Sequence, residues 1–280
     1  MRFRGLAVFP LLYAAVFIAV SWSLLGSESL ASFLVGQRLL VRVLALVGCF
    51  AAMSVFERGD HLRRAWLLLG SGTVLILIRD LLRLNDSFKP ANAGPWETAI
   101  LSSLVVLANL VLLAGVWMLS RAWKKAALLM PGGRSGFLAV GAITAVLAVV
   151  VAGPAAVENA RKLGDGDWTY LGPMVSAIAD ILSLSLISPL LLTAVSLRGS
   201  LFSWPWALIT AGRVSWLLYD AAAALDSGLL APDFPLAEVF RGLGENFAFA
   251  AGLAQFFVVR HVRRATLARA RPVEARPVPE

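Results

Sequence analysis

Two stretches of the chain, 140 residues apart, each end in an acidic side chain after an apolar segment that contains glycine. Residues 66–80 end in Asp80 and residues 206–220 end in Asp220, and six of the fifteen aligned positions are identical. Both segments are apolar enough to cross a bilayer, where an ionisable side chain costs about 2.5–3.5 kcal/mol on insertion scales. Such side chains are usually kept for function, so the two aspartates mark a candidate site.

Polar side chains in the neighbouring apolar segments fall at a similar depth, except that Asn109 and Arg213 lie deeper, near the midplane. The candidate ligand-binding residues are Arg42, Arg79, Asp80, Asn109, Asp180, Arg213, Asp220, Arg241, Glu245 and Asn246. Because residues three, four and seven positions apart share one face of a helix, these groups collect on polar stripes. In a membrane such stripes must face one another rather than lipid. The pattern therefore predicts a charged vestibule inside a helix bundle.

The charges in this layer do not balance in number. The layer contains six arginines and four carboxylates. The arginines are Arg38, Arg42, Arg79, Arg83, Arg213 and Arg241, and the carboxylates are Asp80, Asp180, Asp220 and Glu245. Arginine binds carboxylate and phosphate groups bidentately, so a surplus of two positive charges predicts an anionic small molecule or lipid headgroup as ligand. The alternative is a set of structural ion pairs without a ligand. The candidate pairs are Arg42 with Asp180, Arg79 or Arg83 with Asp80, and Arg213 with Asp220 or Glu245.

The elements that must position these residues are apolar helices. Hydrophobic residues make up 59% of the chain and the mean hydropathy is +0.79, whereas soluble proteins contain about 45–50% apolar residues. A helix needs about 20 mainly apolar residues to cross a bilayer. Eight such runs occur, at 5–25, 36–56, 65–85, 97–120, 137–157, 172–197, 203–225 and 237–260. The predicted fold is an all-α integral membrane protein with eight transmembrane helices, whose expected partners include membrane lipids.

Cations gather in alternate loops. They lie before the first run and after each even-numbered run, as Arg2, Arg4, Arg58, Arg63, Arg64, Arg121, Lys124, Lys125, Arg134, Arg198 and six arginines from Arg260 to Arg276. The other loops carry most of the acids, namely Glu28, Asp86, Glu97, Glu158, Asp165, Asp167, Asp226, Asp233 and Glu238. By the positive-inside rule both termini are cytoplasmic, and the vestibule faces outward from the inner membrane. The net charge of +8 therefore reflects topology rather than nucleic-acid binding.

An internal duplication links the two halves. Asn109 and Gly115 match Asn246 and Gly252 with the same spacing, in addition to the shared segments that end in Asp80 and Asp220. An even number of helices in each half gives two parallel repeats. We expect one four-helix repeat at 1–130, a second at 131–262, and a disordered, basic, proline-containing tail at 263–280. The first run also fits a signal peptide, although the repeat requires it as a helix.

The sequence lacks the motifs of the common cofactors. Only His61 and His261 occur, both at expected cytoplasmic helix ends, so no histidine pair can face a haem and no Cys/His cluster offers zinc ligands. The chain has no P-loop, no Gly-x-Gly-x-x-Gly and no Gly-x-Ser-x-Gly sequence. The runs 36–56, 97–120 and 203–225 hold no lysine that could form a retinal Schiff base. We therefore expect neither a cofactor nor a bound metal.

Paired acids also permit hydrolysis, because two carboxylates in different environments can act as general acid and base. Eight helices and two glycine-containing segments that each end in an intramembrane aspartate resemble the bacterial lysoplasmalogenase family. That family's pattern has Gly-Asp and Ser-Asp dipeptides, a Lys-Pro in the second helix and a histidine in the fourth. This chain has Arg79-Asp80 and Tyr219-Asp220, no proline after Arg42, and no histidine at 97–120. The resemblance implies a shared shape, with Asp80 and Asp220 as the catalytic pair.

The preferred interpretation is non-enzymatic. The arginine surplus, the duplication and the absence of a nucleophile motif favour a carrier or ligand-sensing module for an anion. A sensor would pass its signal to a membrane-protein partner. The alternatives are the lipid hydrolase with paired Asp80 and Asp220, and a structural subunit of a larger membrane complex.

Overall fold

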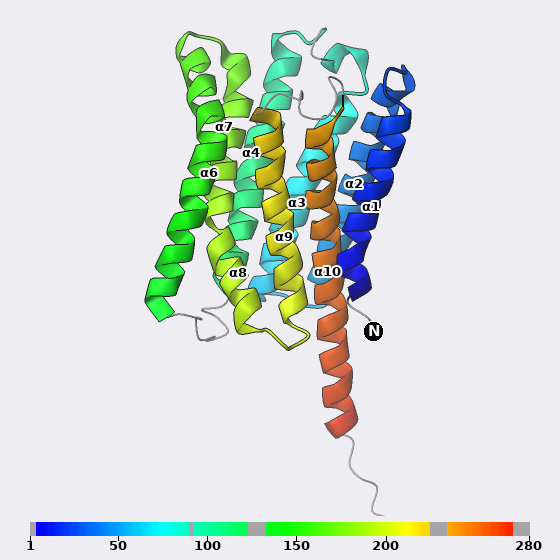
Figure 1. Cartoon of the computed structure of the whole chain (residues 1–280), viewed down its shortest axis with the longest axis vertical. Coiled ribbons are helices and arrows are strands. Elements are labelled where there is room, and N and C mark those ends of the chain that lie inside the picture. Colours follow the sequence, from blue (N-terminus) through cyan, green and yellow to red (C-terminus); the bar gives the residue numbers. More distant parts are fainter. Residues whose placement is uncertain (1–3, 90–91, 123–132, 225–233, 271–280) are drawn as a thin grey trace, which may run out of the picture.

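The computed structural model describes residues 4–89, 92–122, 133–224 and 234–270, and their regular structure is entirely helical. The long helices are α1 (Arg4–Ser23), α2 (Ser29–Ser54), α3 (His61–Leu82), α4 (Pro95–Ser120), α6 (Gly133–Gly164), α7 (Leu171–Ser185), α8 (Ile187–Ser196), α9 (Ser203–Ala224) and α10 (Leu236–Ala270). Two short 3₁₀ turns, η1 (Asp86–Phe88) and η2 (Trp168–Tyr170), lie in loops at the same end of the bundle (Figure 1).

The helices are those of a multi-pass membrane protein. Seven are long and apolar enough to cross a bilayer, with α7 and α8 counted as one span from Trp168 to Ser196. The remaining helix, α9, has 22 residues but is less apolar and carries Arg213 and Asp220. Large apolar side chains such as Leu12 and Val150 are exposed on the outer surface of the bundle, where lipid satisfies them.

The predicted runs correspond to these helices, with differences at their ends. The run 172–197 is two helices, and α6 extends beyond 137–157 at both ends. The helix α10 continues to Ala270 and projects beyond the bundle (Figure 1), so residues 263–270 are helical, which corrects the expectation of disorder from 263 onward. The loop charges Lys124, Lys125, Asp226 and Asp233, like residues 271–280, lie outside the described residues.

The helix α10 is the centre of the packing. It lies against α1, α2 and α9, while α3 packs between α2 and α4, and α4 contacts α7. On the far side α6 packs against α7, and α8 packs against α9. The main buried apolar cluster, which includes Trp66, Trp206 and Val258, joins α2, α3, α4, α8, α9 and α10. Both halves of the chain therefore contribute to one core.

Small residues allow two of these helices to touch along their backbones. A Cβ atom on Gly252 of α10 would lie 2.1 Å from the carbonyl oxygen of Gly48 on α2. A Cβ atom on Gly48 would lie 2.6 Å from the Cα atom of Phe249. Such close approach is typical of small residues at helix interfaces in membranes. It brings α2 and α10 close enough for their charged side chains, one to two turns away, to meet.

The span from Trp168 to Ser196 is interrupted at Leu186. The backbone N–H of Leu186 donates to the Ser183 carbonyl at 3.2 Å, a tight closure that ends α7. Pro189 lies in the first turn of α8 and has no N–H to donate to the Ser185 carbonyl, so the hydrogen bond that would continue α7 into α8 at this position is absent. Pro154, by contrast, lies within an uninterrupted α6. The sequence contains both prolines, yet only one of these spans is divided.

Candidate functional site

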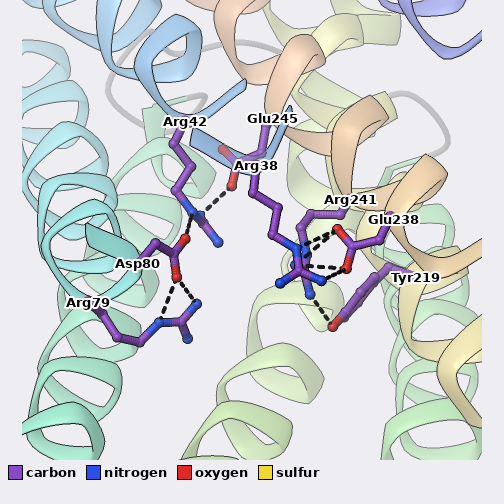
Figure 2. Close-up of polar contacts among 8 residues, drawn as sticks. All are labelled: Arg38, Arg42, Arg79, Asp80, Tyr219, Glu238, Arg241 and Glu245. Atoms are coloured by element: carbon purple, nitrogen blue, oxygen red, sulfur yellow. Dashed lines mark hydrogen bonds and ion pairs between the residues drawn. The ribbon is translucent and has the colours of Figure 1, made fainter. Parts of the chain in front are cut away.

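Arg42 is the hub of a buried ion network between three helices (Figure 2). Its Nε donates to Asp80 Oδ2 at 2.5 Å, and its Nη1 donates to Glu245 Oε1 at 2.8 Å. The other oxygen of Asp80 accepts two hydrogen bonds from Arg79, at 2.9 and 2.5 Å. These four residues, the Arg42 network, join α2, α3 and α10. The side chains of Arg42, Asp80 and Glu245 are all about nine-tenths buried.

A second network forms around Glu238, one to two turns away on α10. Arg38 binds this carboxylate bidentately, at 3.0 and 2.7 Å, and Arg241 contacts it at 3.0 and 3.1 Å. Arg241 also donates to the Tyr219 hydroxyl on α9 at 2.7 Å (Figure 2). These four residues form the Glu238 network, which links α2, α9 and α10. Arginine suits this role because its planar fork satisfies several oxygens at once.

Glu238 changes the charge count made from the sequence. The sequence groups it with the acids of the outer loops, but it lies in the first turn of α10 and is buried between two arginines. Six arginines therefore face five carboxylates in this layer, so the surplus falls from two to one. The intervals of three and four residues between Glu238, Arg241 and Glu245 also predict one shared helix face, and Glu238 and Arg241 are indeed in contact on α10.

A cavity of about 180 Å³, here the inner cavity, lies between these helices. Seven of the ten predicted site residues line it: Arg42, Arg79, Asn109, Asp180, Arg213, Arg241 and Glu245. Asp80, Asp220 and Asn246 do not, although Asp80 is bonded to two arginines that do. The cavity walls come from both halves of the chain, from α2, α3 and α4 and from α7, α9 and α10.

The predicted ion pairs form only in part. Arg79 pairs with Asp80 as expected, but Arg42 pairs with Asp80 and Glu245 instead of Asp180. Arg213 has no ion pair within 4 Å in the described part of the chain, although Asp180 and Glu245 are near enough to act on its charge. An arginine thus enters the cavity without a bonded counter-charge.

The aspartates on α7 and α9 are likewise not held by arginine. Among the described residues, neither Asp180 nor Asp220 has an ion pair, and the Oδ2 atom of Asp220 is buried without a hydrogen-bond partner. Asp180 is within electrostatic range of both Asp220 and Arg213. The carboxylate near Asp220 is therefore that of Asp180, whereas Asp80 is occupied by Arg42 and Arg79.

The two predicted asparagines make the same local bond in each half. Asn109 donates to the Val105 carbonyl at 3.0 Å, and Asn246 donates to the Gly242 carbonyl at 2.8 Å. Each carbonyl lies four residues earlier on the same helix. Asn246 is fully buried and its Oδ1 atom has no partner, while Asn109 lines the inner cavity. Asn109 is thus the one of the two that a ligand in the inner cavity can contact.

Several residues of the cavity wall were not identified as site residues from the sequence. The most informative is Trp66, which is 2% exposed and whose indole Nε1 has no hydrogen-bond partner. A buried indole N–H normally finds one. The other polar, aromatic or sulfur-bearing residues of the wall that were not predicted are Cys49, Thr73, Ser176, Ser183, Trp216 and Tyr219. In the sequence Trp66 is one of the positions shared by residues 66–80 and 206–220, and nothing in that pattern indicates that its indole N–H lacks a partner.

A second cavity of about 480 Å³, here the outer cavity, adjoins the first. The two share Arg79, Val105 and Ser176 in their walls. Arg83, Thr98, Ser102 and Thr169 add one further guanidinium and three hydroxyl groups. The described residues that line the outer cavity include no carboxylate. It lies among the ends of α3, α4 and α7, beside the loops that carry η1 and η2.

Comparison with protein-family models, curated proteins and solved structures finds no match for the chain. Within the described ranges, no three histidine, cysteine, aspartate or glutamate side chains are placed to hold a metal ion. What the fold and this geometry define is a class: a multi-pass helical membrane protein with a charged cavity between its helices.

Proposed function

We propose that the protein is a membrane carrier or ligand-sensing module that binds a small anion in the inner cavity. The observation that carries this proposal is Arg213, a guanidinium in the cavity wall without a bonded carboxylate. Arg213 is partly buried, and a partly buried cation without a bonded counter-charge is costly, so an anionic ligand would satisfy it. Trp66 Nε1, an unpaired donor in the same wall, supports a ligand with hydrogen-bond acceptors.

The outer cavity supports access from one side of the membrane. Its cationic and hydroxyl-bearing wall suits an anion, and Arg79 lines both this cavity and the inner one. The distribution of loop cations favours the extracytoplasmic side for this mouth, with both termini cytoplasmic. A ligand with its charged group near Arg213 would extend past Arg79 toward Arg83.

Two parallel repeats are part of the proposal, and matching contacts support them. The packing of α3 on α4 corresponds to that of α9 on α10, and α2 on α10 corresponds to α4 on α7. Gly72 faces the Ala108 carbonyl oxygen on α4, as Gly212 faces the Gly244 oxygen on α10. The first helices differ, because α1 packs on α10 and α6 packs on α7. Repeat-built transporters place their sites between repeats, where the inner cavity lies.

The hydrolase alternative gains less support. Both oxygens of Asp80 accept hydrogen bonds from arginine, so this carboxylate is poorly placed to exchange a proton with water. Asp220 is electrostatically close to Asp180 rather than forming a pair with Asp80. The resemblance to the lysoplasmalogenases rested on the Asp80 and Asp220 pair, so we keep the non-enzymatic function.

The proposal predicts that Arg213→Gln weakens anion binding about tenfold to hundredfold, since a hydrogen bond to a charged group contributes about 1.5–3 kcal/mol. The full chain in detergent would be titrated with inorganic phosphate, acetate and succinate, and the shift of its thermal midpoint recorded. The control is Arg198→Gln, a cation that follows α8 and lies outside the inner cavity. Equal stabilisation of Arg213→Gln and wild type, or no stabilisation by any of these anions, would contradict the proposal.

A further inference from the structure

A third cavity, of about 450 Å³, lies at the opposite end of the bundle from the outer cavity. It is formed between the end of α2 and the part of α10 that projects beyond the bundle (Figure 1). Its walls are Ser54, Val55, Phe256, Arg260, Arg263, Arg264 and Leu267, and we call it the α2–α10 pocket. None of these residues belongs to the inner cavity or to either ion network.

The α10 residues of the pocket form a single stripe. From Phe256 the intervals are four, three, one and three residues, which places all five side chains on one face of the helix. Arg260 stacks on the Phe256 ring, with its guanidinium carbon 5.0 Å from the ring centroid. No ion pair holds Arg260, Arg263 or Arg264 within the described part of the chain, and no carboxylate is among the residues that line the pocket.

The depth of the pocket follows from the register of α2 and α10. Arg38 pairs with Glu238, Arg42 with Glu245, and Gly48 contacts Gly252, so the two helices run parallel. Continuing this register places the end of α2, at Ser54, level with Val258. At 1.5 Å per residue, Arg260 lies about 3 Å past that level and Arg264 about 9 Å past it.

This depth matches the lipid headgroup layer. The headgroup regions add about 10–15 Å in total to a hydrocarbon core of about 30 Å, so each is several ångströms thick. The three arginines thus stand at the level of lipid phosphates if α2 ends at the membrane surface. Phe256 and Val55 bound the pocket on the side of the hydrocarbon, and Leu267, 68% exposed, extends the stripe at its other end.

We propose that the α2–α10 pocket binds the headgroup of an anionic phospholipid. The phosphate of the lipid is held by Arg263 and Arg264, with Arg260 fixed against Phe256 beside it. Its acyl chains run along the exposed apolar surface of the bundle. Guanidinium forks bind phosphate oxygens bidentately, and the absence of lining carboxylates leaves these arginines free for that role. The site is separate from the anion site around Arg213.

The test compares lipids and variants of the full chain in neutral detergent micelles. Phosphatidylglycerol should raise the thermal midpoint of the wild type in a saturable manner, and phosphatidylcholine should not. The double variant Arg263→Gln/Arg264→Gln should bind phosphatidylglycerol about tenfold to thirtyfold more weakly, as expected for two arginines near a charged headgroup. A matched control, Arg58→Gln/Arg64→Gln, removes two exposed arginines from the loop side of α3, outside the pocket, and should bind it as the wild type does.

Three results would overturn the proposal. Equal loss of lipid binding in the control would mean that only the total charge matters. Full stabilisation by inorganic phosphate would identify a site for a soluble anion instead of a lipid. Unchanged binding by the double variant would place the lipid elsewhere. Because the pocket shares no residue with the inner cavity, the Arg213→Gln titration tests the proposed function separately.

Discussion

Replacing Arg42 by alanine should destabilise the protein by about 3–5 kcal/mol, the cost of removing one partner of a buried ion pair. Arg42 is bonded to both Asp80 and Glu245, and each of these side chains is about nine-tenths buried. Asp80 would retain Arg79, but Glu245 has no other hydrogen-bonded arginine among the described residues. The measurement is the free energy of unfolding in mixed micelles, from denaturant titration of the purified variant.

The matched control for this prediction is Arg38→Ala on the same helix. Arg38 is 38% exposed, and its partner Glu238 keeps its contacts with Arg241, so the loss should be about 1 kcal/mol or less. Adding Glu245→Gln to Arg42→Ala should recover part of the stability, because the unpaired charge is removed. If Arg42→Ala costs no more than Arg38→Ala, then the Arg42 network does not hold α2, α3 and α10 together.

Gly252→Ala should be similarly damaging, with a loss of about 3 kcal/mol or more. The added Cβ atom would lie 2.1 Å from the carbonyl oxygen of Gly48 and 2.3 Å from its carbonyl carbon. Overpacking usually costs about 1–3 kcal/mol, and here the obstacle is backbone, which cannot rotate away as a side chain can. The helices α2 and α10 must move apart, which strains the Arg42–Glu245 contact one to two turns away. Thermal midpoint and the folded fraction on size-exclusion chromatography would measure the effect.

Gly36→Ala provides the control, because a Cβ atom at Gly36 meets nothing within 4 Å. Alanine is also the better helix former, so this variant should be as stable as the wild type or slightly more stable. If Gly252→Ala kept the wild-type midpoint, the close contact between α2 and α10 would be wrong.

The helices could be predicted because a membrane-spanning helix is recognisable from the apolar composition of its residues alone. A run of about 20 apolar residues has few stable structures other than a helix that spans the membrane. The depth of the polar layer also followed from counting along each span, and seven of the ten predicted residues line one cavity. The break at Leu186 was less accessible, since Pro154 and Pro189 both lie within apolar runs and only the run with Pro189 is divided.

The partners within the layer could not be derived from depth. The sequence offers Asp180 as a partner for Arg42, but Arg42 reaches Asp80 and Glu245 because α2 packs on α3 and α10. Glu238 lies at the start of the apolar run 237–260. At such a position the neighbouring residues do not show whether a side chain lies in the loop or is buried in the bundle. Trp66 Nε1 lacks a partner only because of how the neighbouring helices pack around it. These features depend on which helices are neighbours and on how each helix is rotated about its own axis. The pattern of apolar residues does not determine either.

The interruption at Leu186 divides one span into two helices with different surroundings. Ser176, Ala179, Asp180 and Ser183, the residues of this span that line the inner cavity, all belong to α7, whereas α8 packs mainly against α9. Because continuous i to i−4 hydrogen bonding stops between them, we expect the angle between α7 and α8 to be easier to change than the direction of an unbroken helix. A change in the angle between α7 and α8 at Leu186 would therefore alter the space around Arg213, because the cavity-lining residues of this span all lie on α7.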